Sequence, residues 1–109
     1  MSKPTVLVVD DEPDLVELVS LTLNRMNLDT RSAGDVAGAR ALLRAESFDL
    51  CLTDMRLPDG DGLDLVAWIQ EHRPSLPVAV ITAHGNVEAA VRALKLGAFD
   101  FVSKPLDLG

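Results

Sequence analysis

The sequence of 109 residues contains no tyrosine, few other aromatic residues and no long apolar run. A transmembrane helix needs about 20 predominantly apolar residues, whereas the apolar runs of this chain are only a few residues long. The chain starts with MSKPTVLVVDDE, in which two aspartates end the apolar run and no small-residue cleavage site is found. This pattern differs from that of a signal peptide. We therefore expect a cytoplasmic protein that does not bind membranes.

Cysteine is nearly absent, because Cys51 is the single one in the sequence. One cysteine cannot form an intramolecular disulfide, and its apolar neighbours Leu50 and Leu52 predict a buried thiol in a reducing compartment. The two histidines, His72 and His84, are not part of a cluster of histidines and cysteines. A zinc site is therefore not expected.

Basic residues are in the minority, since 10 lysines and arginines stand against 17 aspartates and glutamates and the net charge is −7. A domain that grips nucleic acid needs a basic face, so direct binding of DNA or RNA is not expected. Acidity alone is explained by solubility. However, acidic residues cluster at 10–14 and again at 54–64, and the two clusters would form a cation site if the fold brought them together.

Apolar runs alternate with amphipathic stretches along the chain, without an internal repeat. The runs 5–9 (TVLVV) and 78–81 (VAVI) are too continuous for strands with one solvent face, so both are predicted to be buried on both faces. A weaker strand is expected at 28–33, and further strands at 49–53 and 99–102. Buried strands that alternate with helices require a mostly parallel sheet with helices on both faces, which is an α/β fold.

Four helices are predicted between these strands. The first begins at Pro13, and the second is capped by Asp35. The third spans 63–73, and the fourth runs from the cap Asn86 to the terminating Gly97. The first helix is expected to bury a broad stripe, made of Leu15, Val16, Leu18, Val19, Leu23 and Met26. The fourth is expected to bury Val87, Ala90, Val91 and Leu94.

Polar residues follow the predicted strands. Asp10 and Asp11 follow the first strand, Asp54 follows the third, Thr82 the fourth, and Lys104 comes shortly after the fifth. The carboxyl ends of parallel strands meet at one edge of the sheet, where ligands of such folds bind. An aspartate after a strand is more often a turn former or a helix cap. Three crowded carboxylates, however, need a compensating cation, and oxygen ligands suit Mg²⁺ or, alternatively, Mn²⁺.

A metal ion, a hydroxyl and an ammonium around a central carboxylate favour in-line phosphoryl transfer to that carboxylate. Asp54 would attack, Thr82 would donate a hydrogen bond, and the metal and Lys104 would neutralise the phosphoryl oxygens. Ser103 lies in no nucleophile elbow, so a serine hydrolase is not indicated. The loop 60–62 (GDG) lacks the lysine of a phosphate-binding loop, so no nucleotide cofactor is expected.

Four motifs carry a resemblance to a known family: VLVVDDE at 6–12, LTDMRLPDGDG at 52–62, VAVITAHG at 78–85 and FVSKP at 101–105. They resemble the signatures of the receiver domain of two-component response regulators, in order and over nearly the whole chain. The resemblance implies a flavodoxin/CheY-like, doubly wound five-stranded parallel sheet with strand order 2-1-3-4-5. It also implies that residues 1–109 form a single receiver domain, the N-terminal part of a longer regulator.

The resemblance assigns roles at the phosphorylation site. Asp54 would accept a phosphoryl group from a sensor histidine kinase. Asp11 would bind Mg²⁺ directly, Asp10 largely through water, and Asp54 and the main-chain carbonyl of Arg56 would complete the protein ligands. Thr82 would contact the phosphoryl group together with Lys104. The side chain of Arg56 would tune dephosphorylation, or would simply be a solvated turn residue.

Further expectations of the resemblance concern the switch and the fold around it. Phe101 occupies the family's switch-aromatic position, although plain core packing would equally explain an aromatic residue in a strand. The Lys104–Pro105 bond is expected to be cis. The fifth helix of the family is missing or truncated, so we expect lowered stability, an altered dimer or segment exchange, with a homodimer among the outcomes. Asp59 and Asp61 are expected to shape the turn into the third helix.

The stretches RLPDGDG and TAHGNVEAAVRALKLGAFDFVSKPLDL are most similar to receivers of the nitrogen-regulation (NtrC) class. Such receivers usually precede an ATPase module that activates sigma-54 RNA polymerase and a DNA-binding domain, and neither module is in this chain. The domain is thus expected to catalyse only its own phosphorylation and dephosphorylation, and not to be an enzyme otherwise.

Two alternatives remain open. A haloacid-dehalogenase-like, Mg²⁺-dependent phosphatase also uses an aspartate at a strand end, but its second acid would fall at Arg56. A receiver-like module that binds partners without being phosphorylated would have no need of the complete set of functional residues.

Overall fold

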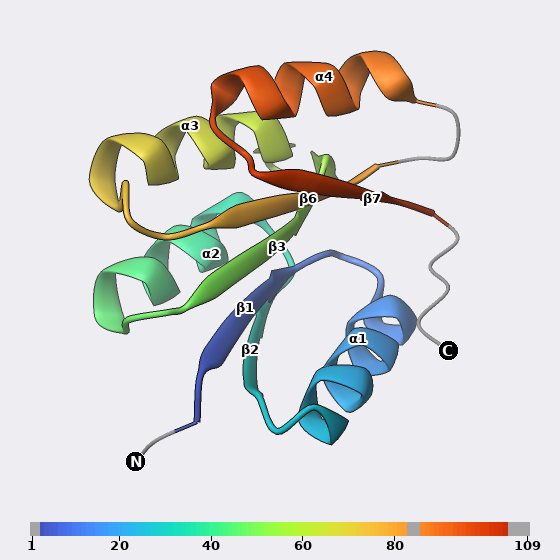
Figure 1. Cartoon of the computed structure of the whole chain (residues 1–109), viewed down its shortest axis with the longest axis vertical. Helices are drawn as coiled ribbons and strands as arrows, with labels where there is room; N and C mark the ends of the chain where they lie inside the picture. The colour runs from blue at the N-terminus through green and yellow to red at the C-terminus, as the bar shows by residue number, and fades with distance from the viewer. Residues whose placement is uncertain (1–2, 83–85, 105–109) are drawn as a thin grey trace.

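Five strands form one parallel sheet in the order β2-β1-β3-β6-β7 (Figure 1). The structure is a computed structural model that describes residues 3–82 and 86–104. The strands of the sheet are β1 (Thr5–Val9), β2 (Asp29–Ala33), β3 (Leu50–Asp54), β6 (Val78–Thr82) and β7 (Asp100–Ser103). This is the predicted order 2-1-3-4-5, because β6 and β7 are the fourth and fifth strands of the sheet.

The strands β4 and β5 are not part of this sheet and form a separate antiparallel hairpin. β4 (Arg56–Leu57) pairs with β5 (Gly60–Asp61) directly after β3. The sequence did not predict this hairpin, because strands of two residues are too short to show a hydrophobic period. It projects from the edge of the sheet at which β3 ends.

The described residues contain four helices, which cover both faces of the sheet (Figure 1). They are α1 (Pro13–Arg25), α2 (Val36–Ala45), α3 (Gly62–His72) and α4 (Val87–Leu96). Leu7 and Val9 of β1 belong to the larger buried cluster, which includes residues of α2, α3 and α4. Val6 and Val8 belong to the smaller cluster, with Val19 of α1. The prediction that β1 is buried on both faces is therefore confirmed.

The apolar face of α1 is narrower than predicted. Val19 is its one fully buried residue, and Leu15, Val16 and Leu23 pack partly against the sheet. Leu18 and Met26, which were predicted to be buried, are exposed. The stripe of six apolar residues is wider than the contact that one helix makes with a sheet, so its margins face solvent.

The predicted inner face of α4 is correct only at Ala90. Ala90 and Ala93 are the buried residues of this helix. The other residues predicted to be buried are exposed: Val87, Val91 and Leu94. Two alanines allow the helix backbone to approach its neighbours closely, and the larger side chains then point outward. Gly97 ends α4 as predicted, with the left-handed φ of 119° that glycine adopts readily.

The outer strand β7 is exposed along its whole length among the described residues. It pairs with β6 alone, and its apolar residues Phe101 and Val102 contact solvent. An apolar groove of about 120 Å³ lies between it and α1, lined by Val19, Thr22, Leu23, Met26, Leu52, Ile81 and Val102. The expectation of a missing fifth helix concerns residues 105–109, which lie outside the described residues. No helix in the described part of the chain is long and apolar enough to cross a membrane.

Candidate functional site

The polar residues predicted from the strand ends gather at one edge of the sheet. Asp10 follows β1, Asp54 is the last residue of β3, Thr82 is the last of β6, and Lys104 follows β7. Because all these strands are parallel, their carboxyl ends meet there. Only 3% of Asp10, 7% of Asp54 and 1% of Thr82 is exposed. Such burial of carboxylates is unusual unless charge or hydrogen bonds compensate for it.

Four acidic residues converge at this edge. Asp10, Asp11, Glu12 and Asp54 each offer a carboxylate oxygen, and these oxygens lie within 4.8 Å of one another. Asp11 and Glu12 are exposed at the rim, whereas the other two are buried. The two acidic clusters of the sequence therefore meet in space. Glu12 belongs to the first acidic cluster of the sequence but was not among the predicted site residues.

The hydrogen bonds of the buried carboxylates leave one oxygen free. Oδ1 of Asp10 accepts from the Glu12 backbone N–H at 2.9 Å, and Oδ1 of Asp54 accepts from the Met55 backbone N–H at 2.7 Å. Oδ2 of Asp10 is buried and has no hydrogen-bond partner among the described residues. A buried anionic oxygen that accepts no hydrogen bond is a favourable ligand for a cation. The residues present therefore suit Mg²⁺.

Electrostatics at Asp10 support this interpretation. Burial raises the pKa of the Asp10 carboxyl, the hydrogen bond from the Glu12 backbone opposes this, and the charge of Asp54 raises the pKa further. The raised pKa means that ionised Asp10 is destabilised where it lies. A divalent cation at this edge would remove that penalty.

Lys104 supplies a positive charge that contacts the carboxylates directly. Its Nζ lies 3.0 Å from Oε1 of Glu12, 3.3 Å from Oδ2 of Asp54 and 3.7 Å from Oδ2 of Asp10. The backbone N–H of Lys104 donates to the Thr82 carbonyl at 2.8 Å, which fixes the residue beside the end of β6. Burial lowers the pKa of Lys104, but the hydrogen bond to Glu12 and the charges of Asp10 and Asp54 outweigh it and raise the pKa. The ammonium is therefore charged.

An open cavity of about 290 Å³ lies over these groups. It is lined by Asp11, Glu12, Asp54, Met55, Arg56, Asn86 and Lys104. Asn86 also caps α4, where its side chain accepts from the Ala89 backbone N–H at 3.2 Å. Thr82, which was expected to contact a phosphoryl group, is not among the lining residues. Arg56, the exposed residue of β4, borders the cavity as expected.

The loop after Asp54 is held by a close approach of α3. An added Cβ at Gly62 would collide with the carbonyl oxygen of Asp54, so only glycine is tolerated here. The Gly62 N–H donates to the Met55 carbonyl at 2.8 Å. Asp61 caps α3 by accepting from the Leu63 N–H at 2.9 Å, as expected of a residue that shapes this turn.

Asp59 has a different role from the predicted one. Its carboxylate accepts from the backbone N–H groups of Val36 at 2.7 Å and of Ala37 at 3.0 Å, at the N-terminus of α2 rather than of α3. These two hydrogen bonds lower the pKa of the Asp59 carboxyl. The loop that carries the aspartates is thereby tied to α2. A contact between residues 23 positions apart has no local signal in the sequence.

Two expectations concern the end of the described chain. Phe101 is 37% exposed on β7, so it does not belong to the core, which argues against the core-packing explanation. The expected cis bond between Lys104 and Pro105 involves a residue outside the described part of the chain.

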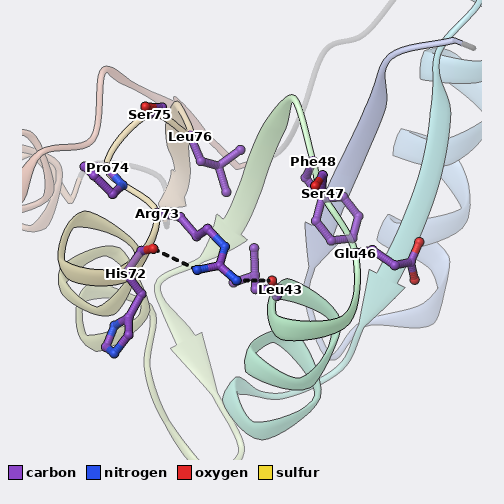
Figure 2. A pocket seen from close by; sticks show the side chains of 9 residues that line it. All are labelled: Leu43, Glu46, Ser47, Phe48, His72, Arg73, Pro74, Ser75 and Leu76. Carbon is purple, nitrogen blue, oxygen red and sulfur yellow. Dashed lines mark hydrogen bonds between the residues drawn. The ribbon is translucent and has the colours of Figure 1, made fainter.

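A second cavity, also of about 290 Å³, lies at the opposite edge of the sheet, between the loops before β3 and β6 (Figure 2). Arg73 lies across it, and its guanidinium donates to the carbonyls of His72 at 2.8 Å and of Leu43 at 3.2 Å. These carbonyls belong to the last turns of α3 and α2, where a cation is favourable. Four of the predicted site residues line the first cavity and none lines this one: Asp11, Asp54, Arg56 and Lys104.

Comparison with known proteins agrees with this geometry. The pattern of the response regulator receiver domain matches residues 6–109. The chain is 63% identical over 109 residues to the response regulator protein PilR of Pseudomonas aeruginosa, covering 100% of this chain and 24% of PilR. It is 38% identical over 108 residues to the DNA-binding transcriptional regulator NtrC of Proteus hauseri, covering 99% of this chain and 23% of NtrC.

Among solved structures, the receiver domain of NtrX from Brucella abortus superposes with a TM-score of 0.91 at 40% identity, covering 94% of this chain and 88% of that one. The chain spans about a quarter of the length of the curated regulators named above. The match over nearly all residues, the strand order and the acidic edge of the sheet agree with one another. The chain belongs to the response regulator receiver domain family.

Proposed function

We propose that this domain is a phosphorylation-dependent switch that accepts a phosphoryl group on Asp54 from a sensor histidine kinase. One observation carries the proposal. The carboxylate of Asp54 ends the central strand β3 under an open cavity, with Oδ2 3.3 Å from the ammonium of Lys104. A carboxylate that faces a cavity beside a fixed cation is arranged for attack on phosphorus.

The reaction is a displacement at phosphorus. A carboxylate oxygen of Asp54 forms the new P–O bond, and the bond from phosphorus to the donor breaks, with its electron pair leaving on the donor. The ammonium of Lys104 neutralises charge on the phosphoryl oxygens, and the hydroxyl of Thr82 donates a hydrogen bond to one of them.

Asp10, Asp11 and Asp54 would hold Mg²⁺, with the main-chain carbonyl of Arg56 as a further ligand. The unpartnered Oδ2 of Asp10 supports this assignment. When bound, the ion supplies positive charge against the repulsion between the carboxylates and the phosphoryl group. Mn²⁺ is the alternative ion.

The signal would pass to an output module in a longer protein. PilR and NtrC are about four times as long as this chain, which supports a receiver that is one part of a multidomain regulator. We place the receiver at the N-terminus of that regulator. Their similarity to the NtrC class supports an ATPase module that acts on sigma-54 RNA polymerase, together with a DNA-binding domain. Phe101 and Thr82 would change position together on phosphorylation, and the exposure of Phe101 on β7 leaves its ring free to turn.

Incubation with Mg²⁺ and acetyl phosphate, followed by measurement of intact mass, tests the proposal. We expect the mass to increase by one phosphoryl group, and we expect no increase in Asp54→Asn or without Mg²⁺. Steady release of phosphate without an adduct would instead indicate a phosphatase. An unchanged mass with both acetyl phosphate and a histidine kinase would indicate a module that works without phosphorylation.

A further inference from the structure

Glu12 makes the shortest contact of the Lys104 ammonium. Its Oε1 lies 3.0 Å from Nζ, compared with 3.3 Å for Asp54 and 3.7 Å for Asp10. The side chain of Glu12 is 61% exposed and that of Lys104 is 25% exposed. The ammonium thus lies between an exposed carboxylate at the cavity mouth and a buried one at its floor.

This arrangement matters because the phosphoryl group needs the same ammonium. A phosphoryl group on Asp54 would add several anionic oxygens inside the cavity that Glu12 and Lys104 both line. An ammonium has three N–H donors. Two of them are used in hydrogen bonds to Glu12 and Asp54, and Oδ2 of Asp10 lies at ion-pair distance, 3.7 Å from Nζ.

We propose that Glu12 is a positioning residue that holds Lys104 in the unphosphorylated domain and competes with the phosphoryl group for its ammonium. This inference rests on the proposed phosphorylation of Asp54. Glu12 thereby slows phosphorylation. The Lys104 ammonium must give up its contact with Glu12, or divide its hydrogen bonds between Glu12 and the phosphoryl group, before it neutralises the transferring group. The contact lies largely in solvent, so the effect is modest.

The replacement Glu12→Gln tests the inference, since it removes the charge with little change in shape. The matched control is Glu17→Gln, because Glu17 is an exposed acid of α1 that forms no ion pair with Lys104. We expect E12Q to be phosphorylated by acetyl phosphate about two- to fivefold faster than the unmodified protein, the range set by exposed ion pairs. E17Q is expected to be phosphorylated at the same rate as the protein without substitutions.

A direct readout of the contact comes from the lysine side chains. The sequence has three lysines, Lys3, Lys95 and Lys104, so a ¹⁵N-lysine NMR spectrum has three ammonium signals to assign. E12Q should shift the signal of Lys104 and leave the other two in place, and E17Q should shift none of the three. A purely structural role of Glu12 away from Lys104 would not produce this pattern.

Two competing explanations are separated by further measurements. If Glu12 were a metal ligand, E12Q would weaken Mg²⁺ binding about tenfold or more, whereas we expect a change within about twofold. If Glu12 acted only by repelling the anionic donor, E12Q would accelerate the reaction equally in a Lys104→Ala background. We expect the acceleration to vanish in that background.

The outcomes distinguish this inference from the proposed function. Absence of an adduct on the unmodified protein would refute phosphorylation of Asp54, whatever the NMR spectrum shows. If the original sequence does form the adduct, four results would each overturn the role of Glu12 alone. They are an unchanged phosphorylation rate in E12Q, an unshifted Lys104 signal in E12Q, a tenfold loss of Mg²⁺ affinity in E12Q, and acceleration by E12Q that survives in the Lys104→Ala background.

Discussion

The aspartates around the β3–α3 loop show how strongly a residue depends on its surroundings. Asp54 faces the cavity and Lys104, whereas Asp59 binds the N-terminus of α2 and Asp61 caps α3. In the sequence these three lie within eight positions and look alike. Their contacts give them different chemistry, because Oδ2 of Asp54 lies beside the ammonium of Lys104, whereas Asp59 and Asp61 accept from backbone N–H groups at helix N-termini.

The hydrogen bonds of Asp59 predict how the stability of the domain changes in acid. Its pKa is lowered from 3.8 by the two backbone hydrogen bonds, so the folded state binds its proton more weakly than the unfolded state does. The stabilisation is present above the unfolded pKa and is lost as the pH falls through the folded pKa. We expect Asp59→Asn to lower the free energy of unfolding at pH 7, with the difference shrinking as the pH drops below 3.8.

Urea unfolding of both proteins at a series of pH values would measure this. Asp14→Asn, in the first turn of α1, is the control for loss of one acidic charge near a helix start. A stability difference for Asp59→Asn that stays constant down to the lowest pH would contradict the assignment.

At the scale of elements, local sequence patterns predicted what depends on continuous runs and missed what depends on distant contacts. β1 and β6 were evident from their unbroken apolar runs, and so was the set of polar residues that follows the strands. The buried face of α4 was predicted wrongly, because two alanines decide it and larger residues dominate a hydrophobic pattern. The hairpin β4–β5 and the contact of Glu12 with Lys104 had no period or motif to reveal them.

The junction of β3 and α3 makes a prediction at this scale. Gly62→Ala places a methyl group where the carbonyl oxygen of Asp54 lies, so backbone must shift. We expect a loss of about 1–3 kcal/mol in the free energy of unfolding, the usual cost of overpacking, and slower phosphorylation because Asp54 moves. Denaturant unfolding and the acetyl phosphate reaction measure the two effects.

Gly34→Ala is a matched control for that experiment. The nearest atom to an added Cβ at Gly34 is the carbonyl oxygen of Asp10 at 4.0 Å, which is ordinary contact distance. We expect this variant to unfold and react like the unmodified protein. Equal behaviour of the two alanine variants would show that the close approach at Gly62 is not needed.

For the molecule as a whole, Cys51 is an internal probe of unfolding. Its thiol is 0% exposed in the larger core cluster, and burial raises its pKa to about 12. A native thiol of this kind is inert, so labelling requires opening of the core. If Mg²⁺ binds the folded domain as proposed, we expect it to slow labelling of Cys51 in proportion to one plus the ratio of its concentration to its dissociation constant.

Labelling with an aromatic disulfide reagent, followed by absorbance, would measure this effect. Protein unfolded in urea should react at once, and Asp10→Asn should lose most of the response to Mg²⁺. Rapid labelling of the folded protein, or a rate indifferent to Mg²⁺, would show that the thiol is reached without global opening or that the ion binds elsewhere.

The strand order places Asp54 and Lys104 on parts of the sheet that differ in how firmly they are held. Asp54 ends β3, which has hydrogen-bonded neighbours on both sides, whereas Lys104 follows β7, which has one neighbour and an exposed outer side. The ion pair between them joins the central strand of the sheet to one of its edge strands. When the charge at Asp54 changes, few contacts of β7 therefore oppose a movement of Lys104. If Asp54 is phosphorylated as proposed, we therefore expect the edge strand β7 to shift more than the centre of the sheet.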